Sequence, residues 1–342
     1  MKRQQTAACP ECHEFDRRGF LGSLGKGALV AGGLAPAAHL AARADEAPAK
    51  LEKPAEAMIK ELYGTLSDEQ KQTLVMPWNH GADSGLATRL KMVNSPHGSR
   101  EIGKSYTKPQ QELCHQIFKA ICSDDEGYRR ISRNGTFDGS GSFEGIGAMI
   151  FGEPAADKPY ALVFSGHHLT IRCDGNSEPG AAFGGPMYYG DSEDGYSADN
   201  VFNYQTKSVR GVFDALNGDQ RAKAVITGQT PGEQYNSVKF REQGQAYPGV
   251  GFAELGEDQK QLVEQVMRDI LSPYRSEDAD EVMQVIKTNG GLDQMHLAFY
   301  QDAKMNDDNK WHFWRIEGPG FVWNYRVLPH VHTFVNISSK TA

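Results

Sequence analysis

The sequence predicts an α+β fold in which helical N-terminal and central segments pack on a mainly antiparallel C-terminal sheet. Two observations lead to this class. Apolar residues recur at helical spacing in several segments before residue 290, and short apolar and aromatic runs separated by turn residues fill the last fifty positions. We expect a single domain of this kind over residues 45–342.

Capping residues mark the expected helix starts. Pro54–Tyr63 reads as a first helix, and Leu66–Gln70 reads as a capped second start. Thr107 stands ahead of Lys108-Pro109, where an early proline suits the first turn, and apolar residues follow at a spacing of 3.6. The remaining helices are expected over residues 199–216, 257–271 and 277–286.

Strands are expected in the centre of the chain and at its end. Residues 130–145 are rich in Gly, Ser and Asn and predict a loop. Residues 147–152 and 160–173 are β-like. The closing meander is predicted to comprise residues 294–300, 311–317, 321–327 and 330–337, with turns at 307–309 and 318–320.

One short pattern occurs three times, as Leu66-x-x-Glu69-Gln70, Leu216-x-x-Asp219-Gln220 and Leu255-x-x-Asp258-Gln259. The intervals of 150 and 39 residues are unequal, which excludes a solenoid period. An acidic residue in the first turn of a helix explains the pattern. We therefore interpret it as a helix-entry signature.

The first 44 residues are typical of a twin-arginine export signal. Arg17 and Arg18 precede Gly-Phe-Leu, residues 22–42 are rich in Ala, Gly and Leu, and Ala42-Arg43-Ala44 supplies a cleavage pattern of small residues. We expect this segment to engage the twin-arginine translocase and to be removed. The protein would then reside in the periplasm or another extracytoplasmic space.

A haem-attachment spacing, Cys9-x-x-Cys12-His13, lies inside that segment. Haem is attached outside the cytoplasm to a segment that is retained, whereas this one would be discarded with the signal. We therefore do not expect haem.

Charge and cysteine content narrow the function classes. The first 44 residues hold six basic and three acidic residues, so their removal takes the net charge from −8 to −11. Such an acidic chain is poorly suited to nucleic acid or to anionic membranes. No apolar run after the signal is long enough to span a bilayer. The three remaining cysteines, Cys114, Cys122 and Cys173, are too few and too odd in number for a disulfide framework.

Two short segments gather four histidines. On a continuous strand His167 would align with the apolar residues Leu169, Ile171 and Cys173, and His168 with the polar set, so His168 is the better site candidate. His330 and His332 share one strand face, about 7 Å apart at Cα. With His168 they would supply three nitrogen ligands for a transition metal, copper or zinc first on ligand type.

Further residues are candidates for contacts with a ligand or with the ligating histidines. Arg172 and Asp174 follow the first histidine pair, and His296 and Glu317 belong to the closing meander. His167 is a further candidate. For the Arg172–Asn176 segment, local turn chemistry is the competing explanation.

The chemistry stays open between two classes. The first is a metal-dependent enzyme, a hydrolase or oxidoreductase in which the ion activates water or oxygen. The second is a metal-free periplasmic protein that binds a small ligand or a partner and whose histidines only form hydrogen bonds within the sheet. Nucleophile-elbow, HExxH, Walker and dinucleotide-binding motifs are absent from the sequence, which therefore specifies no substrate.

Several segments together resemble an uncharacterised bacterial family, domain of unknown function 3500. They are Ile150-Phe-Gly-Glu-Pro154, Phe164-Ser-Gly-His-His-Leu-Thr170, Gly185-Pro-Met-Tyr-Tyr-Gly190, Trp314-Arg-Ile-Glu-Gly-Pro319 and His330-Val-His-Thr333. The Arg172-Cys-Asp-Gly-Asn176 segment is similar to that of exported planctomycete members. The resemblance implies a shared architecture and no known reaction.

Overall fold

The computed structural model describes residues 54–155, 157–173, 178–228, 230–232, 235–242, 244–301 and 311–339. From Glu52 onward the chain forms one compact unit. The export signal, including Arg17, Arg18 and Ala44, lies outside the described residues, as does Asp174. Within the described part of the chain, no helix is both long and apolar enough to span a membrane.

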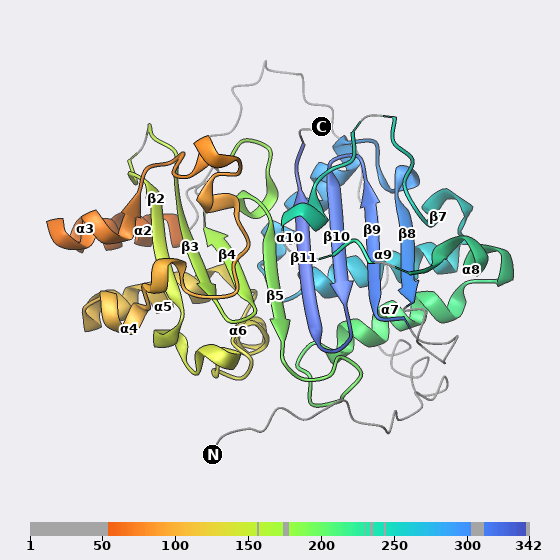
Figure 1. Ribbon diagram of the computed structural model, residues 1–342, viewed down its shortest axis with the longest axis horizontal. Coiled ribbons are helices and arrows are strands. Elements are labelled where there is room, and N and C mark those ends of the chain that lie inside the picture. Colours follow the sequence, from red (N-terminus) through yellow and green to blue (C-terminus); the bar gives the residue numbers. More distant parts are fainter. Residues whose placement is uncertain are drawn as a thin grey trace, which may run out of the picture. The chain divides into compact units, whose positions relative to one another are not determined.

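The predicted α+β class is confirmed, with one large sheet at the centre of the unit (Figure 1). The strand order is β1-β2-β3-β4-β5-β11-β10-β9-β8-β6, and β7 also pairs with β8. All neighbours are antiparallel except β1 with β2 and β6 with β8. The strands are β1 (Val75–Met76), β2 (Gly147–Gly152), β3 (Tyr160–Gly166), β4 (Leu169–Cys173), β5 (Met187–Asp191), β6 (Val225–Thr227), β7 (Val250–Gly251), β8 (His296–Gln301), β9 (Phe313–Gly318), β10 (Phe321–Arg326) and β11 (Val331–Ile337).

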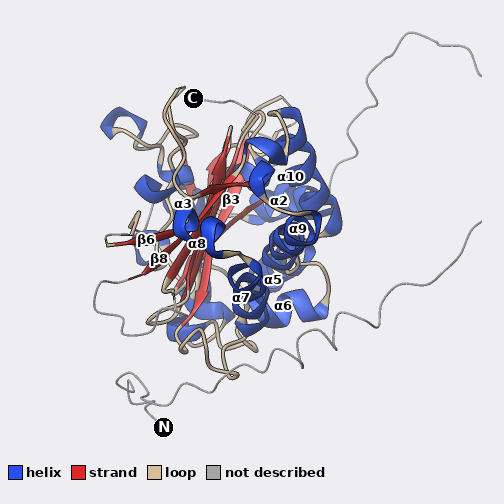
Figure 2. Cartoon of the chain, turned by 90° about the vertical axis from the view of Figure 1, so that its right-hand side faces the viewer, coloured by secondary structure: helices blue, strands red, loops and turns tan. Residues whose placement is uncertain are grey.

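One side of this sheet is covered by helices α2, α5, α6, α7, α9 and α10, as Figure 2 shows. Their apolar faces and the sheet form the main core, in which Trp311, Trp314, Trp323 and Phe118 are fully buried. Each such side chain contributes about 1.5–3 kcal/mol on burial. The helices are α2 (Pro54–Thr65), α3 (Asp68–Leu74), α4 (Ile102–Ser105), α5 (Lys108–Ile121), α6 (Asp125–Ile131), α7 (Asn203–Ala215), α8 (Gly218–Ala224), α9 (Glu257–Leu271) and α10 (Ser276–Thr288).

Loops lie against part of the other sheet face. The segment before α4 is held there by hydrogen bonds from Val93 N to Thr170 Oγ1 and from His97 N to Ser165 Oγ. The segment before β7 is held by the side chain of Asn336, which donates to the Val238 carbonyl. The polar faces of the central strands therefore lie beneath loops rather than beneath helices.

The helix-entry interpretation is confirmed, since the three copies of the pattern lead into α3, α8 and α9. The first two copies also mark a duplicated architecture. Each half of the unit runs through two helices, a short edge strand, a second pair of helices (α5 and α6, or α9 and α10) and four antiparallel strands. Before that second pair, the first half also has the short helix α4 and the second half the short strand β7. In each half the short strand pairs in parallel with the first of the four, β1 with β2 and β6 with β8. The halves join where β5 pairs with β11.

Matching side-chain contacts support this duplication. Gln70 and Gln110 exchange amide hydrogen bonds of 2.7 and 3.1 Å between the starts of α3 and α5. Gln220 and Gln259 exchange bonds of 2.9 and 2.7 Å between the starts of α8 and α9. The 150-residue interval in the sequence is thus the spacing of two similar halves, which is a different arrangement from a solenoid.

Candidate metal centre

Three histidine side chains converge at one end of the junction between β5 and β11. His330 Nε2 lies 3.2 Å from His168 Nε2 and 3.0 Å from His332 Nε2, and the three ligand atoms all lie within 4.8 Å of one another. Two nitrogens bound at 2.0–2.1 Å to one ion lie about 2.9 Å apart at a right angle and about 3.3 Å apart at the tetrahedral angle. The observed separations fall in this interval.

His168 is held in place by its backbone. It is the second residue of the two-residue turn between β3 and β4, and its φ of +51° places it in the left-handed region. Its N–H donates to Asn94 Oδ1 at 2.5 Å, and its carbonyl accepts from Gly190 N at 3.0 Å. These contacts fix the direction in which the imidazole leaves the turn.

The face assignment made for His167 from strand alternation is wrong. Strand β3 ends at Gly166 and β4 begins at Leu169, so His167 and His168 form the turn and the alternation does not pass through them. His167 is half-buried rather than part of the core, and its ring lies 4.0 Å from that of His168. His168 is the buried member of the pair, with 2% of its surface exposed.

His330 and His332 come from the turn before β11 and from β11 itself. His332 pairs with Gly190 on β5 and with Arg326 on β10. A Cβ atom at position 190 would lie 2.2 Å from the carbonyl oxygen of Val331 and 3.2 Å from Cδ2 of His332. Glycine at this position therefore allows β11 to approach β5 closely enough to bring His332 to His168.

Asp138 fixes the orientation and tautomer of His168. Its Oδ2 atom lies 2.6 Å from His168 Nδ1 and also accepts hydrogen bonds from Ser192 N at 3.0 Å and Ser192 Oγ at 2.9 Å. An ionised carboxylate can only accept, so His168 Nδ1 carries the proton and Nε2 carries the lone pair. That lone pair points toward the other two histidines, as in the carboxylate–histidine pairs of metal sites.

The electrostatics of the pair keep Asp138 charged and His168 neutral. Burial opposes ionisation of Asp138, but the hydrogen bonds from His168 and Ser192 hold the pKa of this carboxyl well below its usual range. Burial lowers the pKa of His168 from 6.5 to about 4, although the hydrogen bond to Asp138 opposes the shift. At neutral pH His168 is therefore a neutral imidazole, the form that binds metals.

His167 lies beside this pair without joining the three-nitrogen cluster. Its Nδ1 atom accepts a hydrogen bond from Gly139 N at 3.1 Å and lies 3.5 Å from Asp138 Oδ2. An atom that accepts from Gly139 cannot donate to Asp138 as well, and the shorter contact favours the first arrangement. The carbonyl of His167 accepts from the buried guanidinium of Arg133 at 2.7 Å.

Arg326 brings a positive charge to the cluster. Its Nη2 lies 2.9 Å from His330 Nε2, and its Nε donates to the carbonyl oxygen of His330 at 3.2 Å. Of the three histidines, His168 and His332 are buried and His330 is partly exposed. Solvent therefore reaches the cluster from the side of His330 and Arg326.

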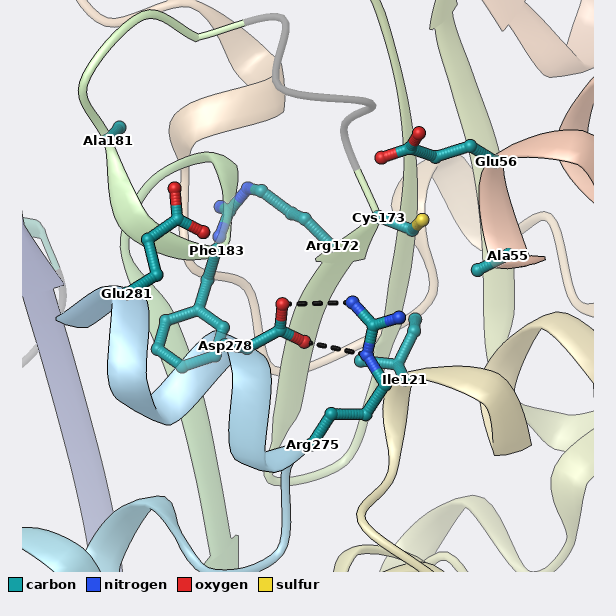
Figure 3. A pocket seen from close by; sticks show the side chains of 10 residues that line it. All are labelled: Ala55, Glu56, Ile121, Arg172, Cys173, Ala181, Phe183, Arg275, Asp278 and Glu281. Atoms are coloured by element: carbon teal, nitrogen blue, oxygen red, sulfur yellow. Dashed lines mark hydrogen bonds and ion pairs between the residues drawn. The ribbon is translucent and has the colours of Figure 1, made fainter. Parts of the chain in front are cut away.

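Arg172 lies away from the three histidines and makes hydrogen bonds to backbone carbonyls of other segments. Its guanidinium donates to the carbonyls of Arg89 at 2.6 Å and Lys91 at 3.0 Å, and to that of Pro186. Figure 3 shows it near the opposite end of β4, beside a small hollow that the Arg275–Asp278 ion pair also lines. The structure thus does not bring Arg172 to the histidines, because three strand residues, 169–171, separate it from His168.

His296 and Glu317 belong to another polar cluster. They are register partners on β8 and β9. Glu317 is 1% exposed and receives a bidentate contact from Arg241, both distances 3.0 Å, and a hydrogen bond from Arg315 at 2.8 Å. His296 stacks on Tyr247. Two arginines therefore neutralise this carboxylate, which lies on β9 rather than among the three histidines.

Asp138 and Arg326 were not predicted from the sequence, and Gly190 appeared there only as the last residue of a family-like segment. Asp138 lies in the Gly- and Ser-rich segment 130–145, whose composition indicated only a loop. The available signal was the acidic residue in Phe137-Asp138-Gly139-Ser140, one of the two acidic residues of that segment, with Glu144. Both Phe137 and Asp138 have positive φ, so a strained local backbone turns this carboxylate toward the histidines.

Comparison with known proteins identifies the family. The family model described as "Protein of unknown function (DUF3500)" matches residues 49–338. The chain therefore belongs to this family, as the resemblance of its motifs indicated. No curated protein and no solved structure matches the chain.

Proposed function

We propose that this protein is an exported metal-dependent enzyme whose ion, zinc or copper, is held by His168, His330 and His332. The observation that carries the proposal is the convergence of the three Nε2 atoms at separations of 3.0 and 3.2 Å, together with the Asp138 contact on the far side of His168. Three nitrogen ligands with a supporting carboxylate are a donor set typical of zinc and copper.

Counting protons supports a cation at the centre. His330 Nε2 has one lone pair, yet Arg326 Nη2, His168 Nε2 and His332 Nε2 all lie within 3.2 Å of it. A second proton on His168 would make it a cation in a buried position, which its lowered pKa opposes. A metal ion accepts a lone pair from each histidine and removes this conflict.

A three-histidine centre leaves at least one coordination position for water, oxygen or substrate. The partly exposed side at His330 provides the approach for it. An ion held in this way lowers the pKa of bound water and supplies a nucleophile, or it exchanges electrons with oxygen if it is copper. Hydrolase and oxidoreductase chemistry are the two reactions open to this site.

Metal analysis of the folded protein tests the proposal. We expect the mature chain to bind about one equivalent of zinc or copper, and His330→Ala and His332→Ala to lose it. His115→Ala is the matched control, because this imidazole contacts the Tyr128 hydroxyl on the helical side of the fold. Substoichiometric metal in the wild type, equal to that in the His330→Ala variant, would support the metal-free, ligand-binding alternative instead.

Export by the twin-arginine route is a second part of the proposal. It rests on Arg17-Arg18, the small-residue stretch after them and the Ala42–Ala44 cleavage pattern. Because this route carries folded proteins, the ion could be bound before export. Fractionation of cells that express the wild type and the Arg17→Lys, Arg18→Lys double variant tests it, with loss of the extracytoplasmic, shortened form expected in the variant.

A further inference from the structure

We infer that the ligand taken up beside the metal is a carboxylate, bound between the ion and the guanidinium of Arg326. This inference rests on the proposed function and specifies the substrate class of the same site. The juxtaposition that carries it is the 2.9 Å contact between Arg326 Nη2 and His330 Nε2, on the side from which solvent reaches the cluster.

Arg326 is anchored independently of the metal. It is the last residue of β10 and pairs with His332 across the β10–β11 hairpin, so the two side chains leave the same face of the sheet. Its Nε atom donates to the carbonyl oxygen of His330, a contact that does not involve the imidazole ring. When the lone pair of His330 Nε2 turns to an ion, the Nε contact still keeps the guanidinium beside that ion.

The charges near the ion favour an anion. The proposed centre consists of three neutral imidazoles and a divalent ion. Asp138 adds one negative charge and Arg326 adds one positive charge, so the net charge of the group is positive. Arg133 and Asp191, two further buried charges, interact with Asp138 and with each other and are opposite in sign. Asp138 accepts hydrogen bonds from His168 and Ser192 and does not face the position beside Arg326. A bound anion would therefore neutralise excess positive charge.

Geometry favours a carboxylate among the anions. A carboxylate can place one oxygen on the ion and the other on the planar guanidinium, which recognises two-oxygen acceptors better than an ammonium group does. A hydrogen bond of this kind to a charged group raises affinity by about tenfold to a hundredfold. Neutral amides of the same shape would lack this gain.

Anion titrations of the copper-loaded protein test the inference. Azide binding is followed by its charge-transfer absorption, and acetate and acetamide are compared as competitors of equal size and different charge. We expect acetate, and not acetamide, to displace azide from the wild type. Arg326→Gln should weaken acetate binding by tenfold or more, Arg326→Lys should weaken it less, and Arg268→Gln, an exposed control on α9, should leave it unchanged.

The outcomes separate the two proposals. Copper bound equally by the wild type and Arg326→Gln, with equal acetate affinity, overturns the role of Arg326 and leaves the metal centre intact. Absence of stoichiometric metal in the wild type overturns both. Retained copper binding in Arg326→Gln also shows that this variant is folded, and Arg326→Lys provides a second, more conservative variant.

Discussion

His168 Nδ1 lies 2.6 Å from Asp138 Oδ2, on the opposite side of the imidazole from the nitrogen that faces His330. The carboxylate therefore acts on the proposed metal centre only through His168. It sets the tautomer, aims Nε2 and makes that nitrogen a stronger donor. Asp138 is accordingly a positioning residue.

Replacing Asp138 tests this relationship. Asp138→Asn should lower metal affinity by about tenfold to a hundredfold, because the amide neither fixes the tautomer nor raises the basicity of the imidazole. Competition with a chromophoric chelator measures the change. Asp214→Asn, which removes the partner of Arg210 on α7, is the control and should bind metal as the wild type does. Equal affinities for Asp138→Asn and the wild type would refute the positioning role.

Close contact between β5 and β11 at Gly190 gives a second prediction. Gly190→Ala should destabilise the protein by about 1–3 kcal/mol, because the new methyl group meets the Val331 carbonyl and the His332 ring. Urea unfolding measures the loss, and metal affinity should fall with it. Gly64→Ala is the matched control: no atom lies within 4 Å of its added Cβ, so within α2 it should stabilise by up to about 1 kcal/mol. Loss of stability in both variants, or in neither, would contradict the close-contact argument.

Acid sensitivity is expected from His97, a buried residue of the loop that precedes α4. Burial, together with the charges of Arg172 and Arg100, lowers the pKa of His97 from 6.5 to about 4. The unfolded chain binds a proton to this imidazole at a higher pH than the folded protein does. The contribution of His97 to the free energy of unfolding is therefore fully present above about pH 6.5 and decreases as the pH falls toward 4. The decrease over that window is about 3 kcal/mol.

The measurement is urea unfolding in chelator at several pH values between 4 and 7.5, for the wild type and His97→Gln. The variant lacks the titrating imidazole, so the difference in unfolding free energy between the two proteins should change by about 3 kcal/mol across the window. Buried His168 titrates in both proteins and cancels in the difference. Parallel profiles would show that His97 does not carry the acid sensitivity.

Local chemistry explains which parts of this fold could be predicted. Helix starts such as those after Ser67 and Thr107 depend on a cap and a glutamine three residues on, and both are visible in the sequence. The convergence of His168 with His332 depends on β11 pairing with β5, and the paired residues lie 140–148 positions apart in the chain, from Val331 with Asp191 to Val335 with Met187. Residue types alone indicated that the histidines suit a metal and did not specify this pairing. The alternation rule failed at His167 because a two-residue turn occupies that position.

The roles of Asp138 and Arg326 could not be predicted from the sequence. Asp138 reaches His168 through a loop with left-handed backbone at Phe137 and Asp138, and no local pattern specifies where such a loop points. Arg326 reads as an ordinary strand-end residue until the β10–β11 turn brings His330 back beside it. The pairing of the two halves was equally hidden, because similarity between them is confined to a few capping residues.

The duplicated amide pairs give the last prediction. In each half a glutamine at the third position of one helix donates to the matching glutamine of the next, and both side-chain oxygens also accept from the backbone of a helix start. Gln110→Glu would remove the donor to Thr65 O and set carboxylate oxygens against the Gln70 oxygen. We expect a loss of about 1–3 kcal/mol.

Because the two halves make the same contacts, we expect the same loss for Gln259→Glu. This change would remove the amide that donates to Ala215 O and to Gln220. Both variants should lower the urea midpoint by similar amounts, whereas Gln284→Glu, at an exposed position on α10, should change it little. Metal affinity should be unchanged in all three, because the amide pairs join helix starts and contact none of the three histidines. A large effect in one half and none in the other would show that the shared contacts are not equivalent in energy.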